Sequence, residues 1–248
     1  HTLAWSLLAH GSVQLPEFNA FPPGLAVRRH LPRAALITEA GCPAEAVYVI
    51  RTGQVRVFLL HECGRETTTA VLGPDQIVGI SPLLGRPLYH AFAEAITPVE
   101  VLALPVSRLK EQLPRNTALL YFILTALGRR LALTEGLVRN VTLLPVAERL
   151  PDVLCRLQEF LGGEPAQLTH EQLGGLVGAR RETVSRAVAT VQAQQWSYLQ
   201  EAAHLPIDGQ QVADASAVLS LVSHYARRKP ATTDPSFNPD AESLPAAS

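Results

Sequence analysis

Short apolar runs separated by turn residues fill the first third of the chain. The runs are VRRHL, ALITEA, AVYVIR, QVRVFLL, TTTAVL, QIVGI, AFAEAI and VEVLAL, between residues 27 and 104. Turn residues punctuate them, for example at Gly53 and at Gly73-Pro74-Asp75. Runs of this length at this spacing are typical of strands in a β-sandwich or rolled barrel. The pattern therefore predicts an all-β domain with eight short strands.

The pattern becomes helical after Pro105. A short helix is expected to end near Pro114, and residues 116–144 then run for about eight helical turns without proline. Apolar residues repeat along this long helix by steps of four and three, with Thr134 in the same register; they are Leu120, Leu124, Leu127, Leu131, Val138 and Val141. A heptad seam of this length needs a partner helix. No other helix in the chain has this length, so a second copy of the chain is the expected partner.

A second face of the same helix is expected to pack on the β-domain through Phe122, Leu133 and Leu137. Pro145 then breaks the helix and acts as a hinge. The following apolar positions predict another helix up to Gly162-Gly163.

Residues 168–195 predict a helix-turn-helix. Thr169 and Gln172 have the spacing of a capping box, so a helix starts at Thr169. Gly178 ends it, because glycine readily adopts the left-handed conformation of a helix C-terminus. A second helix follows, with Val184, Val188 and Val191 as its buried stripe.

The outward face of the second helix carries groups that can read bases. These residues lie near its start and are Arg181, Glu182, Ser185 and Arg186. Arginine can bond guanine O6 and N7 together, and glutamate can accept from cytosine N4 in the major groove. The alternative is an ordinary amphipathic helical hairpin with solvated charges.

The sequences THEQLGGLVG and RRETVSR resemble the bacterial family of the catabolite activator protein and the fumarate-nitrate regulator, over about residues 27–221. The resemblance implies base contacts by Arg181, Glu182 and Arg186, with Ser185 in the E-x-x-S-R variant of the reading helix. Thr169 also belongs to the expected DNA-binding set. Arg180 departs from the family, which usually has a capping serine there, but an arginine can still reach phosphate.

The same resemblance identifies an altered effector pocket. In nucleotide-binding members a glutamate after the glycine at Gly79 holds the ribose, and an arginine–serine pair holds the phosphate. Here Ile80 replaces the glutamate, and Tyr89-His90 replaces the pair. Isoleucine cannot accept from ribose hydroxyls and tyrosine cannot neutralise a phosphate. Arg86 lies three residues too early for the phosphate role.

Arg130 and Thr134 match long-helix positions that approach the ligand in the family, and Glu135 adds a negative charge beside them. We therefore expect no cyclic nucleotide and no cofactor, with control by expression level or by an apolar or redox ligand.

Composition and residue spacing bear on the remaining classes of function: nucleic-acid binding, cluster or metal binding, membrane insertion and catalysis. A net charge of −1 provides no general basic field, so DNA affinity must come from a local patch. Three cysteines without a C-x-x-C do not suit an iron–sulfur cluster. No signal peptide or span of about 18 apolar residues is evident, which favours a cytoplasmic protein. No H-x-H pair and no catalytic constellation stand out, so neither a metal site nor an enzyme is expected, although His30, His61 and His90 could converge from separate strands.

The sequence thus predicts an α+β protein with a cyclic-nucleotide-binding-type β-roll at 1–114, a dimerisation helix and hinge at 115–145, a winged helix-turn-helix at 146–221 and a disordered tail at 222–248. The expected wing is a β-hairpin within residues 196–212, followed by a helix at 213–225. The expected function is sequence-specific binding of double-stranded DNA by a homodimer at a two-fold site, with RNA polymerase as a further partner and no membrane. The alternatives are a small-molecule- or metal-binding β-roll whose helical end contacts protein, and a cupin-like enzyme.

Overall fold

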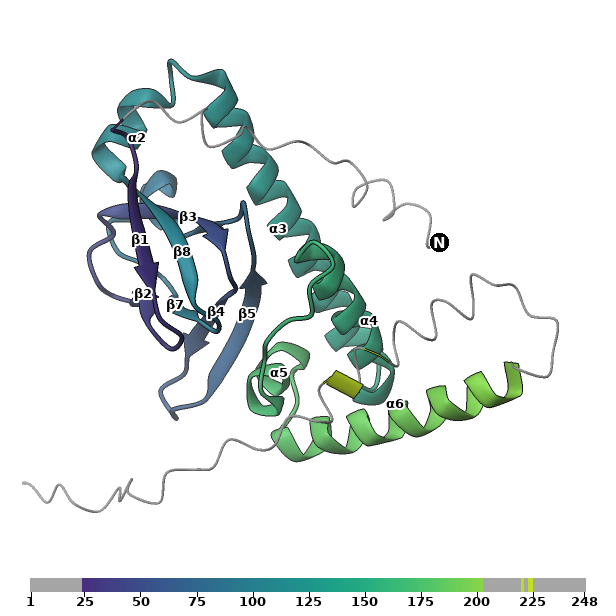
Figure 1. The fold of residues 1–248 in the computed structure, drawn as a ribbon. Helices are drawn as coiled ribbons and strands as arrows, with labels where there is room; N and C mark the ends of the chain where they lie inside the picture. Colours follow the sequence, from purple (N-terminus) through teal and green to yellow (C-terminus); the bar gives the residue numbers. More distant parts are fainter. Residues whose placement is uncertain (1–23, 203–219, 221–222, 225–248) are drawn as a thin grey trace, which may run out of the picture.

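The computed structural model describes residues 24–202 together with Ser220, Ser223 and His224. In this part of the chain, eight strands form two antiparallel four-stranded sheets, ordered β1-β8-β3-β6 and β2-β7-β4-β5 (Figure 1). The strands are β1 Val27–Leu31, β2 Leu36–Thr38, β3 Ala46–Thr52, β4 Val55–Leu60, β5 Glu66–Leu72, β6 Ile77–Val78, β7 Phe92–Ala95 and β8 Val99–Pro105, with a 3-10 turn, η2, at Ser81–Leu84. The predicted all-β domain and its strands are confirmed.

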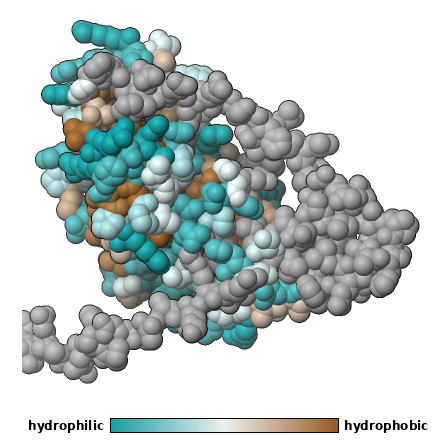
Figure 2. Space-filling view, in the orientation of Figure 1, coloured by the Kyte–Doolittle hydropathy of each residue, from teal (hydrophilic) through white to brown (hydrophobic). Residues whose placement is uncertain are grey.

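Strand β8 is buried on both faces because apolar cores lie on either side of it. Val99 and Val101 join the core between the two sheets. Leu102 and Leu104 join a second core, between the β-roll and the helices that follow it. Successive side chains of a strand point to opposite faces, so one continuous apolar run supplies both cores. On the outside of the molecule, polar residues cover much of the β-roll and apolar residues form smaller areas between them (Figure 2).

The long helix α3, Thr117–Leu143, follows α2, Val106–Gln112. Its N-terminus is capped by Asn116, whose side-chain oxygen accepts from the backbone N–H of Leu119 at 3.0 Å. Phe122 packs on the β-roll as expected. Leu133 and Leu137 instead lie in a core formed mostly by the C-terminal helices, with only Val71 and Ile96 of the β-domain beside them. The second half of α3 therefore packs against the C-terminal helices and supports them.

The heptad seam of α3 lies on its exposed side. Its leucines and valines other than Leu127 are between 42% and 60% exposed; they are Leu120, Leu124, Leu131, Val138 and Val141. Leu127 is half-buried. By length and composition alone α3 is apolar enough to cross a membrane, a criterion that the core helices of soluble proteins also meet. Its apolar residues are divided between the buried face and the seam, and charged residues such as Arg129, Glu135 and Arg139 lie among them.

Three helices form the C-terminal domain: α4 Val146–Phe160, α5 His170–Val177 and α6 Arg181–Ala202 (Figure 1). Pro145 lies between the end of α3 and the start of α4, so the helical structure is interrupted there, as predicted. The expected β-hairpin is wrong at its start, because α6 continues through residues 196–202. The rest of the expected wing lies outside the described residues, as does the tail apart from Ser223 and His224, which have helical backbone like Ser220.

Candidate nucleic-acid interface and effector pocket

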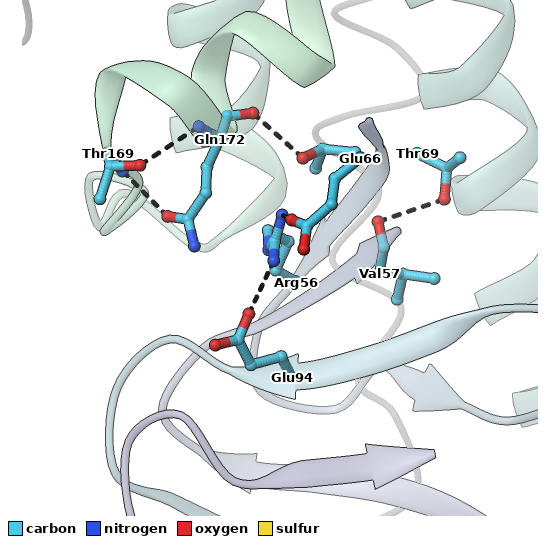
Figure 3. Close-up of polar contacts among 8 residues, drawn as sticks. Arg56, Val57, Glu66, Thr69, Glu94, Thr169 and Gln172 are labelled. Carbon is cyan, nitrogen blue, oxygen red and sulfur yellow. Dashed lines mark hydrogen bonds and ion pairs between the residues drawn. The ribbon is translucent and has the colours of Figure 1, made fainter. Parts of the chain in front are cut away.

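Both ends of α5 are fixed by hydrogen bonds. The side chain of Thr169 accepts from the backbone N–H of Gln172 at 3.2 Å, and the side chain of Gln172 accepts from the Thr169 N–H at 3.0 Å (Figure 3). This is the predicted capping box. Gly178 ends α5 with φ of 66°, in the left-handed region. Arg149 on α4 donates to the carbonyl of Val177 at 2.9 Å, which satisfies a carbonyl at the end of α5.

Most of the predicted DNA-binding residues lie on one exposed surface. Arg180 precedes α6, and the side chains of Arg181, Glu182 and Arg186 are exposed in its first two turns. Thr169 instead uses its hydroxyl to cap α5, so its interactions are within the domain. The exposed groups combine arginine forks with one carboxylate, which is the chemistry required to read base edges.

Ser185 is half-buried and has a partner that the sequence interpretation missed. Nδ1 of His170, on α5, lies 2.9 Å from Oγ of Ser185. The sequence showed only that a polar residue, His170, is the first residue of α5. It did not indicate which residue of α6 the His170 side chain would contact.

Helix α5 also packs directly on strand β5 of the β-roll. Thr68 on β5 donates its hydroxyl to the carbonyl of Gln172 at 3.0 Å. A Cβ added to Gly175 would lie 3.0 Å from the backbone N of Thr68 and 3.1 Å from the carbonyl oxygen of Glu66. A side chain at this position would require helix and strand to move apart by a few tenths of an ångström. Gly174 and Gly175 in the middle of α5 favour a close contact, but the sequence does not indicate its partner.

A buried arginine holds the strand that α5 contacts. Arg56 on β4 pairs with Glu66 at 2.6 Å and with Glu94 at 2.8 Å (Figure 3), and its guanidinium lies 4.0 Å from the ring centroid of Phe58. Its side chain is only 4% exposed. Two charge-assisted hydrogen bonds offset part of the loss of hydration, while the buried Nε of Arg56 has no hydrogen-bond partner among the described residues. They also fix the position of Glu66, whose carbonyl faces Gly175.

The predicted effector pocket is filled by its own residues. Tyr89 is buried and donates its hydroxyl to the carbonyl of Ala46 at 2.6 Å. Its ring packs on Gly79, where an added Cβ would lie 2.9 Å from it. Burial, with Tyr48 nearby, raises the pKa of Tyr89 to about 12. Tyr89 is therefore a neutral structural residue that offers a phosphate no charge.

Ile80 and Arg130 line the small cavity that remains between the β-roll and α3. Its volume of about 10 Å³ holds roughly one water molecule. Burial lowers the pKa of Arg130. Thr134 does not line this cavity, because it is exposed and bonds the carbonyl of Arg130 at 2.9 Å.

His90 and Arg86 lie at the edge of this region and are exposed. Nδ1 of His90 is 2.6 Å from Oγ of the buried Ser81. Partial burial, followed by the positive charges of Arg130 and Arg86, lowers the pKa of His90. The predicted pocket residues are thus close together, but they form a filled and positively charged site.

The three histidines that could have met in a metal site do not do so. Within residues 24–202, which include His30, His61 and His90, no three His, Cys, Asp or Glu side chains gather in a way that could hold a metal ion.

Known protein families match both the β-roll and the helix-turn-helix of this chain. Residues 28–116 match the cyclic nucleotide-binding domain family, and residues 148–202 match the Crp-like helix-turn-helix domain family. The global nitrogen regulator of Nostoc sp. is 31% identical over 179 residues, which cover 68% of this chain and 78% of that protein. The chain belongs to the CRP/FNR family of transcription regulators. The cyclic AMP receptor protein of Thermus thermophilus is 30% identical to this regulator over 161 residues, covering 65% of this chain and 74% of that protein.

Solved structures share the fold of this CRP/FNR regulator. The c-di-GMP responsive global regulator CLP of Xanthomonas campestris superposes with a TM-score of 0.61 at 22% identity, covering 68% of this chain and 88% of CLP. FixK2 of Bradyrhizobium japonicum gives the same TM-score, 0.61, at 23% identity, with 68% and 85% covered. With its family and its helix-turn-helix, this regulator is a DNA-binding transcription regulator.

Proposed function

We propose that two copies of this regulator pair along the seam of α3 and bind a two-fold DNA site through α6 without a cyclic nucleotide. The main support for this proposal is the exposed apolar seam of α3. The same helix packs against the C-terminal helices that include α6. A row of leucines and valines that is this exposed favours association with a matching surface. Pairing along α3 would hold the two α6 helices at a fixed separation, as a two-fold site requires.

The reading surface supports the choice of DNA contacts. Arg181, Glu182 and Arg186 are the proposed base readers, and Arg180 is the proposed phosphate contact. The proposed domain division is a β-roll at 1–114, the helix and hinge at 115–145 and the reading domain at 146–221. We further propose that the protein acts in the cytoplasm and contacts RNA polymerase there.

Nucleotide-free action is supported by the filled pocket. Buried Ile80 offers no acceptor for a ribose. Tyr89 is hydrogen-bonded to backbone and packed on Gly79, and the cavity beside Arg130 has space for about one water. Small-molecule sites usually have volumes of about 300–1,000 Å³. A cyclic nucleotide would have to displace Tyr89, and its ribose would find no acceptor in the side chain of Ile80.

The proposed assembly is tested by charged substitutions in the seam. Leu124→Glu with Leu131→Glu should give monomers in sedimentation and should lower operator affinity, because a monomer engages one half-site only. Leu60→Glu is the matched control, because Leu60 is 52% exposed on β4, away from the seam. It should leave both properties unchanged. A wild-type protein that sediments as a monomer at micromolar concentration would contradict the proposal.

A further inference from the structure

His170 and Ser185 connect the two helices of the helix-turn-helix. His170 is the first residue of α5, and its Nδ1 lies 2.9 Å from Oγ of Ser185 in the second turn of α6. Both side chains are half-buried, whereas Glu182 and Arg186 next to Ser185 are exposed. His170 therefore occupies one side of the Ser185 hydroxyl, and the exposed side faces the surface that reads DNA.

The direction of this hydrogen bond determines what Ser185 can offer to DNA. A serine hydroxyl has one hydrogen to donate and two lone pairs that accept. If Nδ1 of His170 is unprotonated, the Ser185 hydroxyl donates to it and presents only lone pairs outward. If Nδ1 carries a proton, the hydroxyl accepts from it and can donate outward.

The two states suit different bases. Outward lone pairs accept from the amino groups of adenine N6 or cytosine N4, whereas an outward O–H donates to N7 of either purine, to guanine O6 or to thymine O4. One serine can therefore favour different base pairs, depending on the residue that holds it.

We propose that His170 is a specificity-determining positioning residue: it sets whether Ser185 presents a hydrogen-bond acceptor or a donor to the major groove. The proposal rests on the proposed reading of base pairs by α6. His170 acts through Ser185, so its substitution changes the preference at one base pair of each half-site.

The test is a double-mutant cycle on base preference. Relative affinities are measured for a selected operator and for all of its single-base-pair variants, using wild type, His170→Ala, Ser185→Ala and the double variant. His170→Ala and Ser185→Ala should change the preference at the same base pair, by about 2- to 10-fold, the effect of one ordinary hydrogen bond. In the Ser185→Ala background, His170→Ala should cause no further change at that position.

Two further variants separate this role from a structural one. Glu171→Ala alters the exposed neighbour of His170 on α5 and should leave the preference unchanged. His170→Asp supplies only an acceptor, so the Ser185 hydroxyl must donate to it and present lone pairs outward. This variant should favour adenine or cytosine at that position, and should lose this preference when Ser185→Ala is added. Thermal melting of each variant checks that the domain is folded.

Three outcomes would overturn the inference. His170→Ala could lower affinity for every sequence by one common factor, which indicates a purely structural role. The change in preference could persist without the Ser185 hydroxyl, which indicates that His170 acts by another route. Wild-type protein could bind the selected operator and a random duplex with equal affinity. This result would contradict base reading by α6, on which the inference rests.

Discussion

Arg181 and Glu182 lie in the first turn of α6 with exposed side chains, and we propose that they read base edges in the major groove. Arg181→Ala or Glu182→Ala should each weaken binding at the specific site by about 1–3 kcal/mol and relax the preference at one base pair. The measurement is a comparison of affinities for specific and random duplexes. If the ratio of the two affinities is unchanged in both variants, these residues do not read bases.

Asp152 connects α4 to α3 beside the hinge. It accepts from Asn140 on α3, and from Arg156 at 2.6 Å and 3.1 Å. Burial alone would raise its pKa, but the hydrogen bonds from Arg156 and Asn140 outweigh burial and lower the pKa below the ordinary 3.8. A lowered folded-state pKa means that ionised Asp152 stabilises the folded protein above about pH 3.8. This stabilisation is lost as the pH falls through the lowered value.

Asp152→Asn should therefore destabilise the protein near neutral pH, and the difference from wild type should shrink in acid. Urea unfolding of both proteins near pH 7 and near pH 3 measures this difference. A difference in unfolding free energy that is equal at the two pH values would show that the charge of Asp152 is not the stabilising feature.

At the scale of single residues, the sequence predicted the role of a residue when that role depends on residues nearby in the chain. Thr169 and Gln172 form their capping box because both partners lie within one helical turn. Tyr89 was correctly expected to offer no charge to a phosphate, but its bond to Ala46 joins residues 43 positions apart. No local pattern specifies such a pair. The bond between His170 and Ser185 was missed for the same reason.

The contact between α5 and β5 is one of the element-scale features that join the two domains. Gly175→Ala would place a Cβ 3.0 Å from the backbone N of Thr68, which is closer than normal contact. The helix and the strand should separate by a few tenths of an ångström, weakening the bond from Thr68 to Gln172. Hydrogen exchange at the amides of β5 and α5 should become faster, because local opening then costs less free energy.

Gly128→Ala is the matched control for this experiment. Gly128 lies on α3 with nothing within 4 Å of the added carbon, so the substitution changes helix propensity without a clash. It should leave exchange in β5 and α5 unchanged and should stabilise the protein by about 0.5–1 kcal/mol. Equal exchange in Gly175→Ala and wild type would mean that the contact does not restrain the reading domain.

The elements themselves were largely predictable, because their periodicities are local. The eight strands, the long helix and the break at Pro145 all follow from apolar spacing and turn residues. The end of α6 was misjudged: residues 194–202 lack glycine and proline, and the helix continues through them. The docking of α5 on β5 was not predictable, since Gly175 indicates a close approach without its partner.

At the scale of the whole molecule, the account joins three features: the exposed seam of α3, the reading surface of α6 and the filled pocket of the β-roll. Together they support the proposal that the regulator binds DNA as a dimer in the absence of nucleotide. The seam should fix the two α6 helices so that they reach half-sites about 34 Å apart. Neither half-site alone should then be bound tightly.

The most direct test is fluorescence anisotropy with purified, nucleotide-free protein and three duplexes: the selected two-fold operator, a single half-site and a scrambled sequence. The account predicts saturable binding to the operator, at least about 1,000-fold tighter than to the scrambled duplex. It predicts much weaker binding to the half-site, and no change when cyclic AMP or cyclic GMP is added at about 100 μM. A strict requirement for either nucleotide, or equal affinity for the operator and the half-site, would contradict the account.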